Sequence, residues 1–224
     1  MSKKPGYLHK YFLENSGRDI FRHTHYFSIY EKHFARFVDQ SPTILEVGVG
    51  GGGALQMWKA YFGEGTKCIG IDIDQACWFR EKDIDIFVGS QDDPQVIKQI
   101  TDKYPRIDII IDDGSHHNQH MINTFAMLYP HLHHDGIYLV EDCHTCYREE
   151  YGGGFRNEDS FIEFSKKRID DVNALHTRGA CGVSDFTKWT ESISFYDSIV
   201  VYEKRPQSNR HALRTKALDQ TQID

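Results

Sequence analysis

Carboxylate side chains follow two apolar segments of the sequence. Segment 107–112 is followed by Asp113, and segment 136–141 ends in Glu141 with Asp142 next to it. If both segments are parallel strands of one sheet, these carboxylates lie at one edge, because adjacent strands are only about 4.8 Å apart. Three like charges at one point are unfavourable unless a cation joins them. All-oxygen ligands favour a hard cation, so we predict a Mg²⁺ site, with Mn²⁺ or Ca²⁺ as alternatives.

An imidazole follows Asp113 after one short turn. His116 can take a proton from a substrate hydroxyl, while a nearby metal lowers the pKa of that hydroxyl. The structural alternative is that Asp113 caps the following helix and His116 is a solvated residue of its first turn. Because both residues fall on the edge that also carries a glycine turn, we predict that His116 is the catalytic base.

The glycine turn occupies residues 48–53, directly after the apolar segment 43–47. Glycines allow the backbone to turn sharply and to approach a ligand closely. Glu46 would repel the pyrophosphate of a dinucleotide, but it suits a ligand that carries an ammonium and a sulfonium group. We therefore predict S-adenosylmethionine at Glu46, Gly48 and Gly50. The alternatives are NAD and a tight turn without a ligand.

Four further polar residues are predicted to bind the same ligand. Asp72 ends the second apolar segment and can accept hydrogen bonds from both ribose hydroxyls, a role that NAD sites share. Ser90 and Gln91 follow the third segment, where they would meet the adenine edge. Asp112, at the end of the fourth segment, is assigned to the donor site as well.

The composition excludes several classes of protein. The 224 residues fit one α/β domain, and 39% apolar residues with 14 Phe, 12 Tyr and 3 Trp exclude wholesale disorder. A net charge of −7 argues against nucleic acid or a membrane surface as a partner. The sequence has no apolar run of membrane-spanning length and no export signal, so we expect a cytoplasmic protein with reduced thiols. The single CxxC pair, Cys143 and Cys146, is a weak zinc signal.

Short apolar strands that alternate with helices must position these residues. We expect strands over 43–47, 67–72, 85–89, 107–112 and 136–141, and helices over 26–37, 54–62, 94–103 and 118–129. This alternation is typical of a parallel sheet covered on both faces. Beyond residue 150 the expected elements are a helix over 158–175, a loop over 176–190, and a closing strand or antiparallel pair over 192–203.

The chain divides into three regions. Residues 1–40 are predicted to be an aromatic, helical segment that forms a lid or an oligomer contact, 41–204 the domain that binds S-adenosylmethionine, and 205–224 a mobile polar tail. Four residues of the first region are candidates for an acceptor wall, with a simple packed helix as the alternative: His23, His25, Tyr26 and Tyr30.

Four motifs carry a resemblance to a known family. They are residues 45–53 (LEVGVGGGG), 111–116 (IDDGSH), 140–142 (VED) and 195–204 (FYDSIVVYEK). In this order they resemble the class I S-adenosylmethionine methyltransferases of the macrolide-sugar O-methyltransferase type, close to mycinamicin O-methyltransferases and to the cephalosporin hydroxylase-like group. The likeness covers roughly residues 20 to 204, and its acidic motifs are more specific than the glycine turn.

The resemblance implies a fold, a metal site and a reaction. The implied fold is α/β, a Rossmann-like, doubly wound, mostly parallel seven-stranded sheet with one antiparallel strand. Mg²⁺ would be held by Asp113, Glu141 and Asp142, with His116 as the general base. Family members methylate sugar hydroxyls and are usually oligomeric. The separate N-terminal domain of the longer macrolide enzymes has no counterpart here, so acceptor contacts from it do not carry over.

The sequence thus predicts a metal-dependent O-methyltransferase. Its partners would be a sugar or glycosylated natural product and a second copy of the chain, with no nucleic acid and no membrane. One alternative is a protein that binds S-adenosylmethionine without catalysis, and another is a nicotinamide-dependent oxidoreductase. A third, an iron oxygenase, needs two histidines and one carboxylate, which would have to include His144 or His117.

Overall fold

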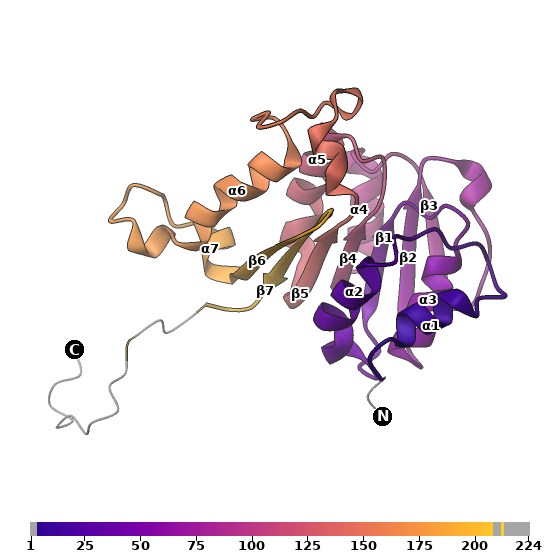
Figure 1. The fold of residues 1–224 in the computed structure, drawn as a ribbon. Coiled ribbons are helices and arrows are strands. Elements are labelled where there is room, and N and C mark those ends of the chain that lie inside the picture. Colours follow the sequence, from indigo (N-terminus) through magenta and orange to yellow (C-terminus); the bar gives the residue numbers. More distant parts are fainter. Residues whose placement is uncertain (1–3, 208–211, 213–224) are drawn as a thin grey trace, which may run out of the picture.

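A sheet of seven strands runs through the computed structural model, which describes residues 4–207 and residue 212 (Figure 1). The strand order is β3-β2-β1-β4-β5-β7-β6. The strands are β1 (Thr43–Val47), β2 (Lys67–Asp72), β3 (Ile84–Val88), β4 (Ile107–Asp112), β5 (Leu132–Val140), β6 (Thr190–Tyr196) and β7 (Ile199–Lys204). Strands β1 to β5 pair in parallel, and β7 runs antiparallel to both of its neighbours. This confirms the predicted fold class and the predicted antiparallel pair.

Helices cover both faces of the sheet (Figure 1). Helices α1, α2 and α3 pack on one face, and α4, α5 and α6 on the other, as the two hydrophobic clusters indicate. The α-helices are α1 (Tyr7–Leu13), α2 (Tyr26–Phe34), α3 (Gly53–Phe62), α4 (Pro94–Lys103), α5 (Asn118–Leu128), α6 (Phe161–Val172) and α7 (Asp185–Trp189). The single-turn 3₁₀ segments are Ala35–Phe37, Gln75–Cys77, Tyr129–His131, Cys143–Tyr147, Glu149–Tyr151 and Ala174–His176.

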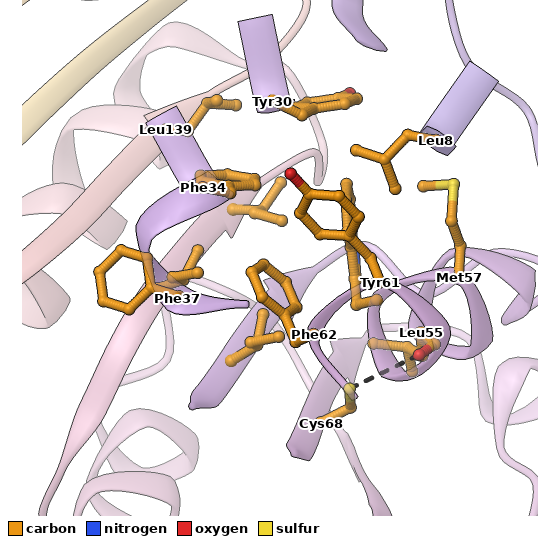
Figure 2. Close-up of a cluster of buried hydrophobic side chains, with 14 of the residues drawn as sticks. Leu8, Tyr30, Phe34, Phe37, Leu55, Met57, Tyr61, Phe62, Cys68 and Leu139 are labelled. Atoms are coloured by element: carbon orange, nitrogen blue, oxygen red, sulfur yellow. Dashed lines mark hydrogen bonds between the residues drawn. The ribbon is translucent and has the colours of Figure 1, made fainter. Parts of the chain in front are cut away.

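The central strands alternate their side chains between the two cores. In β4, Ile109 and Ile111 face the helices α1 to α3, while Ile110 faces the other cluster. Such isoleucine-rich strands, buried on both faces, are typical of parallel sheets. Figure 2 shows the first cluster, in which Phe34 of α2 packs close to Phe62 of α3. The aromatic N-terminal helices are therefore part of the main hydrophobic core.

The structure differs from the expected elements at three places. Helix α1 was not predicted, because its seven residues are too short for a clear amphipathic pattern. Helix α7 lies within the expected loop 176–190, where Ser184 and Thr187 form a reciprocal capping box. Strand β5 begins at Leu132, four residues before the expected start, because its polar first residues conceal the strand pattern.

The functional candidates lie where the direction of the chain through the sheet reverses. Strand β1 has β2 on one side and β4 on the other, and the carboxyl ends of all three face one edge. In open α/β sheets this switch point forms the crevice in which ligands bind. Strand β5 ends at Val140, so Glu141 and Asp142 lie just beyond it.

Most of the predicted mobile tail, 205–224, lies outside the described residues. Among the residues that are described, no helix has both the length and the apolar character needed to cross a membrane.

The aromatic packing of α2 generates a stability prediction. Phe34 is fully buried against Tyr30, Trp58 and Phe62. We expect Phe34→Ala to lower the free energy of unfolding by about 3–5 kcal/mol, since it removes a large core side chain and leaves a cavity. Urea denaturation measures this loss. Phe155→Ala, at a side chain that is 79% exposed, is the control; equal effects of the two changes would contradict the packing.

Candidate active site

The glycine turn after β1 is fixed by the two neighbouring strands. A Cβ atom on Gly48, whose φ is +88°, would lie 2.0 Å from the carbonyl oxygen of Asp113, so only glycine fits there. Asp72 at the end of β2 accepts hydrogen bonds through Oδ2 from the backbone N–H groups of Val49 (2.8 Å) and Gly50 (3.1 Å). Gly50 itself has open space beside it. The turn therefore presents its backbone to the crevice.

The segment between α1 and α2, residues 14–25, lies against this turn, and we refer to it as the strap. A Cβ atom on Gly51 would lie 2.8 Å from the carbonyl oxygen of Asp19, and one on Gly53 would lie 2.2 Å from that of Arg18. The Gly53 N–H donates to the Asp19 carbonyl oxygen at 3.1 Å. Two of the five glycines therefore make room for the strap, which the sequence pattern did not indicate.

Arg22 of the strap inserts its guanidinium among three carboxylates. Its side chain is only 8% exposed. It pairs with Glu46 through Nη2, with Asp113 Oδ2 through Nη1 at 2.7 Å, and with Glu141 Oε2 through Nε at 3.5 Å. Glu46 also accepts a hydrogen bond from the indole N–H of Trp58 at 3.0 Å. The end of β1 and the ends of β4 and β5 thus share one internal cation.

One guanidinium does not fully compensate these acidic groups. Burial raises the pKa of Glu46 to about 7, although the positive charge of Arg22 opposes this shift. Burial also raises the pKa of Glu141 and of Asp113, again against the attraction of Arg22. Raised carboxylate pKa values indicate a site that would gain from additional positive charge.

His116 and Asp142 face each other across the edge of the sheet. His116 Nε2 lies 3.7 Å from Asp142 Oδ2 and 3.9 Å from Asp113 Oδ1. Both residues have left-handed backbone conformations, with φ of 58° for His116 and 52° for Asp142. The hydroxyl of buried Thr145 lies 3.2 Å from the His116 carbonyl oxygen and 2.8 Å from that of Asp142. Strained backbone of this kind is concentrated at functional sites.

The two oxygens of Asp142 serve two different groups of side chains. Oδ2 faces His116, as described, so Asp113, His116 and Asp142 form one group whose ligand atoms lie within 4.8 Å of one another. Oδ1 accepts a hydrogen bond from the Tyr26 hydroxyl at 2.5 Å. Oδ1 also lies 3.8 Å from Nε2 of one histidine and 3.9 Å from Nδ1 of another. These belong to the second group, which is His23, Asp142 and His144.

The predicted metal ligands are only partly brought together. Asp113 and Asp142 share a group with His116, whereas Glu141 turns inward to Arg22 and joins neither group among the described residues. The assignment of Asp113, Glu141 and Asp142 as a ligand set remains a prediction. The group of His23, Asp142 and His144 has the two histidines and one carboxylate that the iron alternative requires, and it includes His144 but not His117.

Two adjoining cavities lie at this edge. The smaller, of about 180 Å³, is lined by the ends of β1, β2 and β3, and the larger, of about 390 Å³, by the strap, the glycine turn and the acidic residues. Gly48, Asp72 and Gly114 line both. The predicted donor residues that line a cavity are Gly48, Gly50, Asp72, Ser90 and Gln91. Their role in ligand binding remains a prediction.

Several predicted donor contacts are engaged within the protein. The side-chain amide of Gln91 donates to Asp112 Oδ1 (3.1 Å) and to Thr124 Oγ1 (3.0 Å), and its Oε1 accepts from the Ser115 N–H (2.7 Å). The Ser90 hydroxyl donates to Asp92 at 2.6 Å. Gln91 therefore shapes the cavity wall, with its amide hydrogen bonds directed into the protein. Glu46 and Asp112 are buried behind the cavity linings.

The sequence analysis missed two residues of the site. Arg22 was not singled out. The signal that could have found it was the need of several clustered carboxylates for a cation, which a basic residue of the aromatic segment can supply. Thr145 lies inside the CxxC pair and drew no attention, because a hydroxyl that supports backbone strain leaves no sequence pattern. Cys143 and Cys146 are free thiols buried in the core.

The chain is similar to several characterised sugar methyltransferases. It is 34% identical over 193 residues to the 8-demethyl-8-alpha-L-rhamnosyl tetracenomycin-C 2'-O-methyltransferase of Streptomyces olivaceus, a match that covers 82% of this chain and 51% of that protein. It is 39% identical over 131 residues to the mycinamicin VI 2''-O-methyltransferase of Micromonospora griseorubida, which covers 55% and 33% of the two chains. The match to the tetracenomycin enzyme thus covers most of this chain but only about half of the length of that relative. No protein-family model matches it.

A solved structure shares the fold. The MycE methyltransferase, in complex with Mg, SAH and mycinamycin VI, superposes with a TM-score of 0.81 at 28% identity, covering 96% of this chain and 57% of that one. A putative caffeoyl-CoA O-methyltransferase from Staphylococcus aureus, at 14% identity and a TM-score of 0.51, supports the fold alone.

Asp112 generates a prediction about pH. Burial raises its pKa from 3.8 to about 7. The native state therefore holds the Asp112 proton more tightly than the unfolded chain does. The protonated carboxyl group stabilises the native state fully below about pH 4, and this stabilisation is lost as the pH rises to about 7. Asp112→Asn stays neutral and does not lose this stabilisation. As the pH rises from about 5 to about 8, we expect its unfolding free energy to increase by about 2 kcal/mol relative to that of the unmodified chain.

Urea unfolding at the two pH values measures this gain. Asp102→Asn, at an exposed side chain on α4, is the matched control and should show no such pH dependence. If Asp112→Asn and the unmodified chain respond alike to pH, the Asp112 carboxyl is not the buried acid that the structure indicates.

Proposed function

We propose that this chain, which has the class I methyltransferase fold and resembles the macrolide-sugar O-methyltransferases, transfers the methyl group of S-adenosylmethionine to a sugar hydroxyl in the presence of a divalent cation. The proposed acceptor is a sugar or a glycosylated natural product, the substrate class of the similar proteins. The observation that carries the proposal is the meeting of Asp113, His116 and Asp142 in a cavity beside the glycine turn.

The two adjoining cavities fit the donor. The ends of β2 and β3 would enclose its nucleoside half, and the glycine turn its methionine half. Asp72 accepts three backbone hydrogen bonds, and a carboxylate with about four acceptor positions can accept one more, from a ribose hydroxyl. Glu46, paired with Arg22 and buried behind the cavity lining, is the proposed partner of the donor's ammonium. The bound donor supplies an electrophilic methyl group on its sulfonium.

The acidic edge fits Mg²⁺. Asp113 and Asp142 each direct an oxygen toward one point, and His116 directs a nitrogen there. Glu141 Oε1 is buried behind them and makes no hydrogen bond of good geometry among the described residues, although the Tyr30 hydroxyl lies close enough to influence its carboxyl group. We propose that these carboxylates hold the cation. When bound, it would supply positive charge that lowers the pKa of an acceptor hydroxyl.

His116 is the proposed general base. Its ring lines the larger cavity, and Nε2 lies within 4 Å of the carboxylates of Asp113 and Asp142, which stabilise an imidazolium. Thr145 fixes the left-handed backbone of His116, and the Tyr26 hydroxyl holds the other oxygen of Asp142. Together these contacts direct Nε2 to the point where an acceptor hydroxyl would lose its proton. Strap residues 19–22 wall the cavity against solvent.

A screen with labelled S-adenosylmethionine tests the function. Nucleotide sugars and glycosides are offered as acceptors, with Mg²⁺ and with a chelator. Methylation of a glycoside that stops on chelation supports the proposal. Binding of S-adenosylmethionine without transfer to any acceptor supports the non-catalytic alternative. Calorimetric binding of NAD but not of S-adenosylmethionine supports the oxidoreductase alternative. Self-association of the chain and the predicted absence of a nucleic acid partner remain predictions.

The first catalytic prediction concerns His116. We expect His116→Ala to lower turnover by roughly 10²- to 10⁴-fold and to leave donor affinity nearly unchanged, because the base touches the acceptor and not the donor. Steady-state kinetics and calorimetry measure the two effects. His117→Ala removes an exposed neighbouring imidazole and should retain full activity. Unchanged turnover in His116→Ala would exclude it as the base.

The second catalytic prediction concerns Asp142. Asp142→Asn keeps an oxygen for the Tyr26 hydroxyl but removes the charge that would attract a cation. We expect the Mg²⁺ concentration for half-maximal activity to rise at least about tenfold, in line with the cost of losing a metal contact. Metal titration of the activity measures it, with Asp102→Asn as the surface control. An Asp142→Asn protein that is fully active in chelator would contradict the metal site.

A further inference from the structure

Arg22 lies at the one point among the described residues where the proposed donor and cation sites share acidic groups. Glu46 belongs to the donor side, and Asp113 and Glu141 belong to the cation side, yet a single guanidinium contacts all three. Its neighbours in the strap do not reach these three carboxylates: Phe21 is 78% exposed, and His23, whose side chain is 45% exposed, lies 3.8 Å from Asp142 Oδ1 instead. Arg22 is the strap residue that joins the two sets of acidic groups.

The contacts of Arg22 are spread rather than paired. An arginine binds a carboxylate most strongly through two parallel N–H···O bonds, but each of the three carboxylates here meets one nitrogen. Nε is buried and makes no hydrogen bond of good geometry among the described residues, since Glu141 lies 3.5 Å away. The guanidinium balances charge across the group without the geometry of a permanent ion pair.

The strap is anchored on both sides of Arg22 but not at it. On one side, the Asp19 carbonyl oxygen accepts from Gly53, and the guanidinium of Arg18 stacks 3.7 Å from the Phe79 ring centre. On the other side, Tyr26 is buried at the start of α2. The backbone of residues 20–22 makes no hydrogen bond to described residues outside the strap. Ile20 packs against the first hydrophobic cluster, so the weakly anchored part of the strap is short and centres on Phe21 and Arg22.

We propose that Arg22 is a built-in cation that neutralises the shared carboxylates in the ligand-free chain and is displaced when the donor and the divalent cation bind. The inference rests on the proposed function and assigns to Arg22 the coupling of its two binding events. Whichever cation binds first must displace the guanidinium, and the second then finds the carboxylates free. Each ligand should therefore raise the affinity for the other, by the same factor in both directions.

The affinity for Mn²⁺ tests this coupling. Free Mn²⁺ is followed by electron paramagnetic resonance, with and without S-adenosylhomocysteine, in the unmodified chain, Arg22→Gln and Arg80→Gln. In the absence of S-adenosylhomocysteine, we expect Arg22→Gln to bind Mn²⁺ at least about tenfold more tightly than the unmodified chain does. We also expect S-adenosylhomocysteine to enhance Mn²⁺ binding much less in Arg22→Gln than in the unmodified chain. Arg80 is exposed and is not a partner of the three carboxylates, so Arg80→Gln should behave as the unmodified chain.

Weaker or unchanged Mn²⁺ binding in Arg22→Gln would overturn the inference, because a permanent structural arginine supports the carboxylates and does not compete for them. If neither the unmodified chain nor any variant binds Mn²⁺ or S-adenosylhomocysteine, the proposed function fails and this inference fails with it. If all bind both ligands equally, only the inference fails.

Limited trypsin digestion tests the displacement in the unmodified chain, and so does not depend on the folding of Arg22→Gln. Arg22 is buried in the ligand-free chain, whereas Arg18, in the same strap, is exposed and serves as the internal reference. We expect Mg²⁺ with S-adenosylhomocysteine to increase cleavage after Arg22 relative to cleavage after Arg18 several-fold, as measured by mass spectrometry. An unchanged or lower ratio would show that Arg22 stays in place, and would overturn the proposal.

Discussion

Charge balance at the carboxyl edge of the sheet is the constraint on which the site depends. The parallel topology brings Glu46, Asp113, Glu141 and Asp142 to one edge, and burial makes the ionised form of the first three costly. A fold with this topology and these residues must supply positive charge there. Arg22 supplies one charge for three carboxylates, of which Glu46 and Glu141 are 1% exposed and Asp113 17%. The remaining deficit supports the proposal that cationic ligands bind at this edge.

Backbone strain directs the reactive side chains away from that buried group. Successive residues in an extended strand point to opposite sides, so Glu141 faces Arg22 in the interior. The left-handed conformation of Asp142 turns the chain and presents its carboxylate to the cavity instead. Such conformations cost about 1–3 kcal/mol each. Thr145, whose hydroxyl lies within hydrogen-bond distance of both strained residues, helps the surrounding structure to hold them.

Sequence reasoning succeeded where topology alone decides position. The ends of parallel strands must share an edge, so the proximity of Asp113, His116 and Asp142 followed from the apolar segments and their order. The outward turn of Asp142, away from Glu141, depends on a left-handed backbone conformation that leaves no pattern. Arg22 depends on the path of an irregular segment, which is fixed by contacts with the distant residue Gly53. Local propensity does not reach such contacts, and they were found only in the structure.

The glycine turn links these features through packing. Its sequence indicated a ligand-binding loop, but Gly51 and Gly53 also lack side chains because the strap backbone passes where their Cβ atoms would lie. Any larger residue at these positions would push Asp19 outward and withdraw Arg22, three residues further along, from the carboxylates. The glycines therefore control the charge balance of the edge as well as its shape. A loop that is expected to bind the donor therefore also holds in place the residue that we propose the donor displaces.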